Sequence, residues 1–162
     1  MTHIRAIETE YNGYRFRSRK EARFAVMLDA LGIPWLYEPE GLALSNGMQY
    51  LPDFLLPGVF GGAWIEIKGT APNEEDFEKA TALCLDSKLP VFITWTNFGD
   101  TSRGHNITFS FDKNGMFSSW QDDTLWEYLR DYIYPWNDID DGWKAARSAR
   151  FEHGEYGTFH YD

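Results

Sequence analysis

The sequence predicts an α/β fold in which helices flank a mixed central β-sheet. Apolar residues recur at helical spacing over residues 18–31 and again over residues 73–86. Short runs rich in aliphatic and aromatic residues, the composition of β-strands, lie between these helices and after the second one. This order predicts one domain over residues 1–162, with its core in about residues 15–95 and the segment 106–151 packed on that core.

The first helix is expected to begin after Ser18 and to end at Gly32. Ser18 and Glu21 form a serine-x-x-glutamate capping pattern, in which a glutamate supports the start of the helix. Capping is a complete structural explanation for Glu21, and a place in a functional site is the alternative. Residues 11–17, which precede the helix, predict a turn and a short extended segment of alternating aromatic residues and arginines.

Two strands are expected to carry the chemistry of the chain, one over residues 49–56 with Asp53 and one over residues 63–69 with Glu66 and Lys68. Because side chains alternate along a strand, Glu66 and Lys68 share one face while the neighbouring isoleucines share the other. If the strands pair as a hairpin, Asp53 comes alongside Glu66. Two carboxylates and an ammonium at strand ends predict a site for a divalent cation or a phosphate. The alternative is a solvated strand face with a surface ion pair.

The other strands and the second helix complete the sheet. Residues 33–38 are expected to form the first core strand, with 42–44 as a short continuation and Asn46-Gly47 as a hairpin turn. A helix over 73–86 followed by a buried strand over 89–95 predicts a right-handed parallel crossover. Glu38 and Glu40 are interpreted as solvated acids at a strand end, and membership of the site is the alternative.

The C-terminal third predicts a hairpin over 107–117, a helix over 122–134, an acidic linker over 137–142 and a basic helix over 143–151. Lys144, Arg147 and Arg150 step by threes, so they fit either solvated charges on a docked helix or a phosphate contact. The tail, residues 152–162, is expected to be loosely ordered. Its residues Glu152, His153 and His160 match no strong metal-ligand spacing and are interpreted as solvated.

Charge is unevenly distributed along the chain. The net charge of −10 argues against binding nucleic acid through bulk electrostatics. Residues 1–23, however, carry six Lys/Arg and three acids, whereas residues 122–141 carry seven acids and one arginine. The single cysteine cannot form an internal disulfide, and no apolar run approaches membrane-spanning length. These features predict a cytoplasmic protein with no membrane partner.

The order of a helix with Glu21, a strand with Pro52-Asp53, a strand with Glu66-Ile67-Lys68, a helix and a buried strand resembles the PD-(D/E)XK nuclease superfamily. That superfamily has a restriction-endonuclease-like α-β-β-β-α-β core. The resemblance covers about residues 15–95 and is strongest to small phage-encoded and transposon-type nucleases, whose third strand ends in Lys-Gly. The glutamine-x-x-x-tyrosine signature of the RecB-like exonuclease branch has no match in the chain.

The resemblance implies a divalent-metal-dependent endonuclease that hydrolyses DNA phosphodiester bonds. It implies Glu21, Asp53, Glu66 and Lys68 as catalytic residues, and Mg²⁺ or Mn²⁺ held by Asp53, Glu66, Glu21 and the main-chain carbonyl of Ile67. Carboxylates are hard oxygen ligands that suit these ions. A cluster of basic residues near the first helix is expected to hold the DNA backbone: Arg15, Arg17, Arg19, Lys20 and Arg23.

Two other functions compete with the nuclease. Net acidity and the lack of an obvious target-recognition domain fit an inactive nuclease fold that acts as a binding or inhibitor module. An acidic DNA mimic would rest on residues 122–141, and the basic residues 1–23 argue against it. For the nuclease, specificity is expected to come from DNA structure or a partner protein, and assembly as a homodimer stays open.

Overall fold

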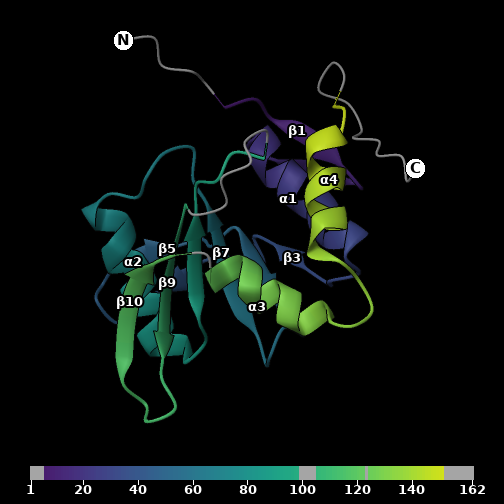
Figure 1. Ribbon diagram of the computed structural model, residues 1–162. Helices are drawn as coiled ribbons and strands as arrows, with labels where there is room; N and C mark the ends of the chain where they lie inside the picture. The colour runs from purple at the N-terminus through teal and green to yellow at the C-terminus, as the bar shows by residue number, and fades with distance from the viewer. Residues whose placement is uncertain (1–5, 99–104, 123, 152–162) are drawn as a thin grey trace.

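A six-stranded mixed β-sheet forms the centre of the computed structural model, which describes residues 6–98, 105–122 and 124–151 (Figure 1). Its strand order is β10-β9-β8-β7-β6-β3; β7 and β8 run parallel, and the other neighbours run antiparallel. The predicted α/β fold with a mixed sheet is therefore confirmed. The strands are β3 (Leu36–Tyr37), β6 (Phe54–Leu56), β7 (Ala63–Ile67), β8 (Val91–Thr94), β9 (Asn106–Phe111) and β10 (Phe117–Gln121).

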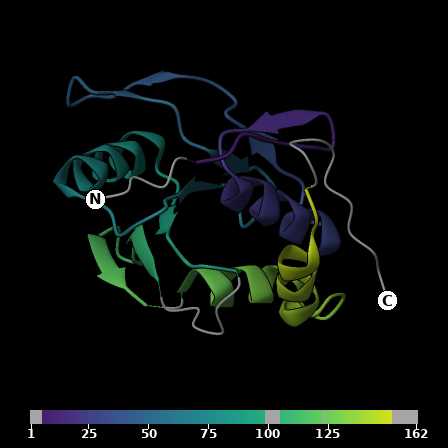
Figure 2. The same cartoon turned by 90° about the horizontal axis from the view of Figure 1, so that it is seen from above.

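Helices cover both faces of this sheet. Residues of α1 (Arg19–Ala30), α3 (Thr124–Ile133) and α4 (Ile139–Ser148) share one core with Ile65 and Phe92, whereas α2 (Glu74–Ser87) shares a second core with Trp64 and Val91. Figures 1 and 2 show α1 and α4 side by side, with α2 apart from them. Because both faces are covered, every residue of β7 and β8 is buried. Ile65 and Ile67, which share one face of β7, lie in the core with residues of α1, α3 and α4.

Capping residues fix the starts of the two predicted core helices. The hydroxyl of Ser18 accepts a hydrogen bond from the main-chain N–H of Glu21 at 3.1 Å. At α2, Asn73 and Asp76 form a reciprocal capping box. Helix α2 connects β7 to the parallel strand β8, as the crossover pattern predicts.

The expected single strand over residues 49–56 is wrong, because two separate strands occupy it. Strand β5 (Gln49–Tyr50) pairs with β4 (Leu42–Ala43) in a small sheet of its own, whereas β6 pairs with β3 and β7 in the central sheet. Pro52 lies between them and has no N–H to donate to a ladder. The break leaves Asp53 directly before β6, which lies between β7 and the edge strand β3.

The N-terminal half departs from expectation at two further points. Within residues 33–38 only β3 is extended, and it lies at the edge of the central sheet rather than in its core. The segment 42–44 does not continue it but forms β4, opposite β5 across the predicted Asn46-Gly47 turn. A second hairpin, β1 (Thr9–Tyr11) with β2 (Tyr14–Phe16), contains the extended segment before α1, and its first strand was not expected.

The C-terminal segment packs on the core, but its last helix begins earlier than expected. Helix α4 starts at Ile139, so the linker predicted over 137–142 is wrong: Asp138 caps the helix, and Asp140 and Asp141 lie in its first turn, where the helix dipole favours them. Gly142 lies so close to α1 that an added Cβ would approach Leu31 Cγ to 2.5 Å. Phe151 lies outside the helix. The predictions for residues 152–162 fall outside the described residues.

Candidate metal centre

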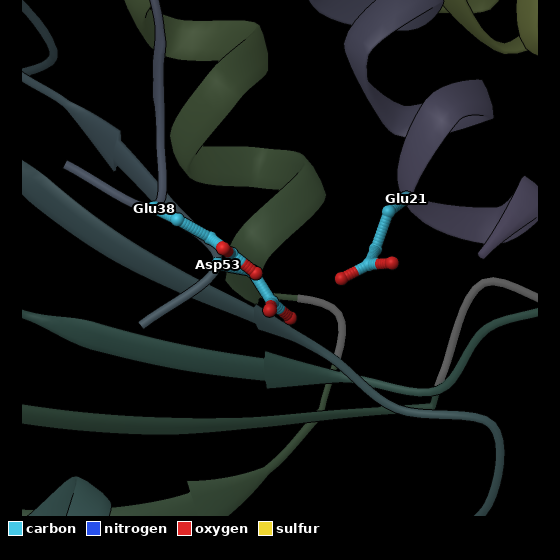
Figure 3. Close-up of side chains that lie close together, drawn as sticks. All are labelled: Glu21, Glu38 and Asp53. Carbon is cyan, nitrogen blue, oxygen red and sulfur yellow. The ribbon is translucent and has the colours of Figure 1, made fainter. Parts of the chain in front are cut away.

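Three carboxylates converge where α1, β3 and β6 meet. Glu21, Glu38 and Asp53 each offer one oxygen, and these oxygens lie within 4.8 Å of one another. Figure 3 shows Glu21 reaching from α1 toward Glu38 and Asp53, which lie close together on the sheet side. Glu21 and Asp53 are only 4% and 7% exposed, and Glu38 is partly buried. We refer to these three residues as the carboxylate cluster.

The capping turn of α1 directs Glu21 into this cluster. Its carboxylate accepts hydrogen bonds from the hydroxyls of Ser18 at 2.9 Å and Tyr37 at 3.4 Å. The structural and functional explanations of Glu21 are therefore compatible, because the residue that supports the helix start also faces the other carboxylates.

Strand pairing places Glu38 opposite Asp53. Tyr37 pairs with Phe54 in the antiparallel β3–β6 ladder. Glu38, the residue after β3, and Asp53, the residue before β6, are therefore neighbours. The N–H of Glu38 donates to the carbonyl of Asp53 at 2.7 Å. Glu38 adopts a positive φ of 42°, which is uncommon for a residue other than glycine. Glu38 is thus a partly buried member of the carboxylate cluster rather than a fully solvated acid, and its membership of a functional site stays a prediction.

Glu66 and Lys68 lie beside the cluster and form a linked pair. One oxygen of Glu66 accepts hydrogen bonds from the Tyr50 hydroxyl at 2.9 Å and from the N–H of Asp53 at 3.3 Å. Its other oxygen lies 3.4 Å from Lys68 Nζ. Lys68 also pairs with Asp76 of α2 at 2.9 Å, which orients the ammonium between two acids.

Ile67 connects the Glu66 strand to the carboxylate cluster. Its main-chain N–H donates to Asp53 Oδ2 at 2.7 Å. This bond fixes one oxygen of Asp53 against the end of β7. A ligand role for the carbonyl of Ile67 stays a prediction.

Burial and mutual repulsion dominate the electrostatics. Burial raises the pKa of Asp53 well above its ordinary value, and the nearby carboxylates of Glu66 and Glu21 raise it further against the opposing Ile67 N–H. Burial also raises the pKa of Glu66, although Lys68 and Tyr50 oppose the shift. For Lys68, burial lowers the pKa, but hydrogen bonding and charge from Asp76 and Glu66 outweigh it and give a net rise. The acids are therefore costly to ionise together, and the lysine stays charged.

The carboxylate cluster fits a divalent cation. Opposite oxygens around Mg²⁺ are about 4.2 Å apart and those around Ca²⁺ about 4.8 Å apart, so the spacing needs only small side-chain adjustments. Buried carboxylates with raised pKa values also gain most from a nearby positive charge. Glu21 and Asp53 were expected in such a site; Glu66 adjoins it through the N–H of Asp53, with its carboxylate directed to Tyr50 and Lys68.

The basic residues expected to contact DNA differ in exposure and in their hydrogen-bond and ion-pair partners. Arg15 pairs with Glu10 at 2.9 Å, and Arg17 pairs with Glu38 of the cluster at 2.7 Å. Arg19 is exposed. Lys20 is partly buried and donates to the carbonyls of Lys68 at 3.2 Å and Trp95 at 3.4 Å, at the ends of β7 and β8.

Arg23 lies farther along α1 and joins that helix to the C-terminal segment. It donates to the carbonyl of Ala146 at 2.7 Å and lies over the ring of Phe151. Lys144, Arg147 and Arg150 are exposed, and α4 packs against α1, as expected of a docked helix with solvated charges.

Comparisons of the chain with protein-family models, with curated proteins and with solved structures return no match. In the described part of the chain, no helix is both long enough and apolar enough to cross a membrane. Glu152, His153 and His160 lie outside the described residues.

Proposed function

We propose that the chain is a divalent-metal-dependent endonuclease that hydrolyses DNA phosphodiester bonds. The observation that carries the proposal is the convergence of Glu21, Glu38 and Asp53 beside the Glu66–Lys68 pair. Strand β6, which begins directly after Asp53, is hydrogen-bonded to β7, which carries Glu66, and Lys68 Nζ lies 3.4 Å from Glu66 Oε1. We also propose a phage-type protein on the basis of that resemblance, and a cytoplasmic location because the single cysteine cannot form an internal disulfide.

The chain's own residues divide the work. The carboxylate cluster would hold Mg²⁺ or Mn²⁺, which activates a bound water and polarises phosphoryl oxygens. Lys68, which forms ion pairs with Glu66 and Asp76, would donate a hydrogen bond to the attacking water or to a phosphate oxygen that gains negative charge. Asp76 and Glu66 together raise the pKa of Lys68, which keeps the lysine charged, and the Tyr50 hydroxyl donates to Glu66 at 2.9 Å.

DNA would approach over the N-terminal hairpin and the start of α1. Arg15, Arg17 and Arg19 are exposed along this path, where a phosphate backbone can meet their guanidinium groups. Arg15 and Arg17 must exchange their carboxylate partners for phosphates, so binding is expected to be weak and sensitive to salt. We therefore propose that selectivity comes from DNA structure or from a partner.

A pair of matched lysine variants tests the reaction. Lys68→Gln is expected to lower the rate of Mg²⁺-dependent cleavage of plasmid and branched DNA by about 100-fold or more, the scale of losing one charge-stabilising donor. The chain offers a control in a second acid-x-lysine triplet, Asp86-Ser87-Lys88, which ends α2. Lys88→Gln is expected to cleave at the wild-type rate. Equal rates for wild type and Lys68→Gln would contradict the proposed nuclease function. No cleavage by wild type with either Mg²⁺ or Mn²⁺ would also contradict it.

The second candidate is an inactive nuclease fold that serves as a binding module. It is favoured by the net charge of −10 and by the ion pairs that occupy Arg15 and Arg17. In this case wild type would show no metal-dependent cleavage of any DNA form, and the residues around the carboxylate cluster would contribute only to stability. A partner would then bind elsewhere on the surface.

A further inference from the structure

The connection between α3 and α4 exposes two adjacent aromatic side chains. Trp136 is 84% exposed and Tyr134 is 76% exposed, and Pro135 separates them. Together they line an open groove of about 530 Å³ with Arg130, Asp138 and Asp141 among its other lining residues. Contiguous exposed apolar surface with a polar rim is typical of a binding site.

Hydrogen bonds hold this connection in one conformation. The N–H of Trp136 donates to the carbonyl of Ile133 at 2.9 Å, which continues the end of α3. The side chain of Asn137 donates to the carbonyl of Leu31 at 3.0 Å, and Asp138 caps α4 by accepting from Asp140 N at 3.0 Å. Ile133 and Ile139 are buried on either side. The aromatic pair therefore projects from a fixed support rather than from a loose chain.

The charge around the groove selects a cationic partner. Among the residues that line the groove, Asp138 and Asp141 are acidic and Arg130 is basic. Residues 124–141 as a whole carry five acids and one arginine. Asp131, Asp138 and Asp141 are exposed. Arginine and lysine side chains stack on the faces of tryptophan and tyrosine while their charges meet carboxylates. A nucleic acid, in contrast, would bring its phosphates against these acids.

We infer that this groove binds a Lys/Arg-rich segment of a partner protein. Trp136 and Tyr134 supply the stacking surfaces, and Asp138 and Asp141 supply the charge that attracts and orients the segment. The groove lies at the C-terminal end of α1, whereas Glu21 lies in the first turn of that helix, about 15 Å away at 1.5 Å per residue. This inference does not depend on the proposed nuclease activity.

The test titrates the full chain with a hexa-arginine peptide, followed by calorimetry and by the indole N–H signals in NMR. Trp136→Ala and Tyr134→Ala are each expected to weaken binding at least tenfold, and Trp136→Phe to retain it within about threefold. Met116→Ala is a matched control, because Met116 is 68% exposed on another turn, and it should change binding less than twofold. Asp141→Asn should weaken binding, whereas Glu78→Gln on α2 should not.

Several results would overturn the inference. They are equal binding by wild type and Trp136→Ala, equal binding of a hexa-citrulline peptide of the same length, and no binding of hexa-arginine at low salt. Equal binding by wild type and Trp136→Ala would mean that the peptide binds only through the net charge of the chain. Light scattering supplies one more: a dimer that Trp136→Ala dissolves would make a second copy the occupant instead.

Discussion

Carboxylates gather near both ends of α1, but the two groups differ in burial. At the N-terminal end, Glu21 and Asp53 are almost fully buried and lie against Glu38. Near the C-terminal end, Asp138 and Asp141 are exposed to water, which screens their repulsion. Ionising carboxylates together is thus unfavourable in the buried group and only slightly unfavourable in the exposed one. A bound cation would relieve the repulsion within the buried group, and this is the basis of the metal site that we propose.

The largest difference between the buried and exposed carboxylates is expected in their contribution to metal affinity. Substitutions of Glu38 and Glu40, which are two residues apart, test it. Glu38→Gln removes a ligand charge and is expected to weaken Mg²⁺ binding about tenfold or more, the scale of losing one group that supports a metal site. Glu40→Gln removes an exposed charge outside the cluster and should change affinity less than twofold. Calorimetric titration of both variants decides the point. Similar affinities would place Glu38 outside the metal site.

A smaller effect is expected on the stability of the metal-free protein. The pKa of Asp53 is raised in the folded state, so folding favours its protonated form, and stability falls as pH rises from the ordinary carboxyl pKa through the raised one. Asp53→Asn removes that penalty while its amide oxygen can still accept from the Ile67 N–H. At pH 7, the free energy of unfolding of Asp53→Asn should be about 1 kcal/mol higher than that of wild type, a typical gain when a strained functional group is neutralised.

The exposed acids provide the control for this stability measurement. Asp131→Asn makes the same chemical change on the surface of α3 and should alter the free energy of unfolding by less than about 0.5 kcal/mol. Urea unfolding at pH 5 and pH 7 without divalent ions measures both variants. If Asp53→Asn is less stable than wild type at pH 7, the carboxylate is a structural hydrogen-bond acceptor and the contrast between the two groups fails.

The sequence was sufficient for the parts of the fold that rest on local pattern. The capping pattern at Ser18, the apolar spacing over residues 73–86 and the alternation around Glu66 predict α1, α2 and β7, and chain order indicates the crossover to β8. From these, the neighbourhood of Asp53 and Glu66 could be anticipated. Their hydrogen bond through the N–H of Asp53 agrees with that expectation.

What the sequence could not supply is the pairing of distant segments. Glu38 becomes a neighbour of Asp53 only because β3 pairs with β6, and nothing local in residues 33–38 specifies that partner or its register. The break at Pro52 likewise depends on a distant pairing, because β5 pairs with β4 rather than continuing into β6. At α4, a run of acids suggested a solvated linker, whereas the helix dipole and the contact of Gly142 with Leu31 favour a helix there.

The most direct test of the carboxylate cluster is calorimetric titration of Mg²⁺ and Mn²⁺ into wild type and Asp53→Ala, with circular dichroism to show that both are folded. A metal centre predicts saturable binding by wild type and at least 100-fold weaker binding by the folded variant, since a buried ligand is lost. Equal affinity in the two proteins, or no binding of either ion by wild type, would contradict a metal centre built on Glu21, Glu38 and Asp53.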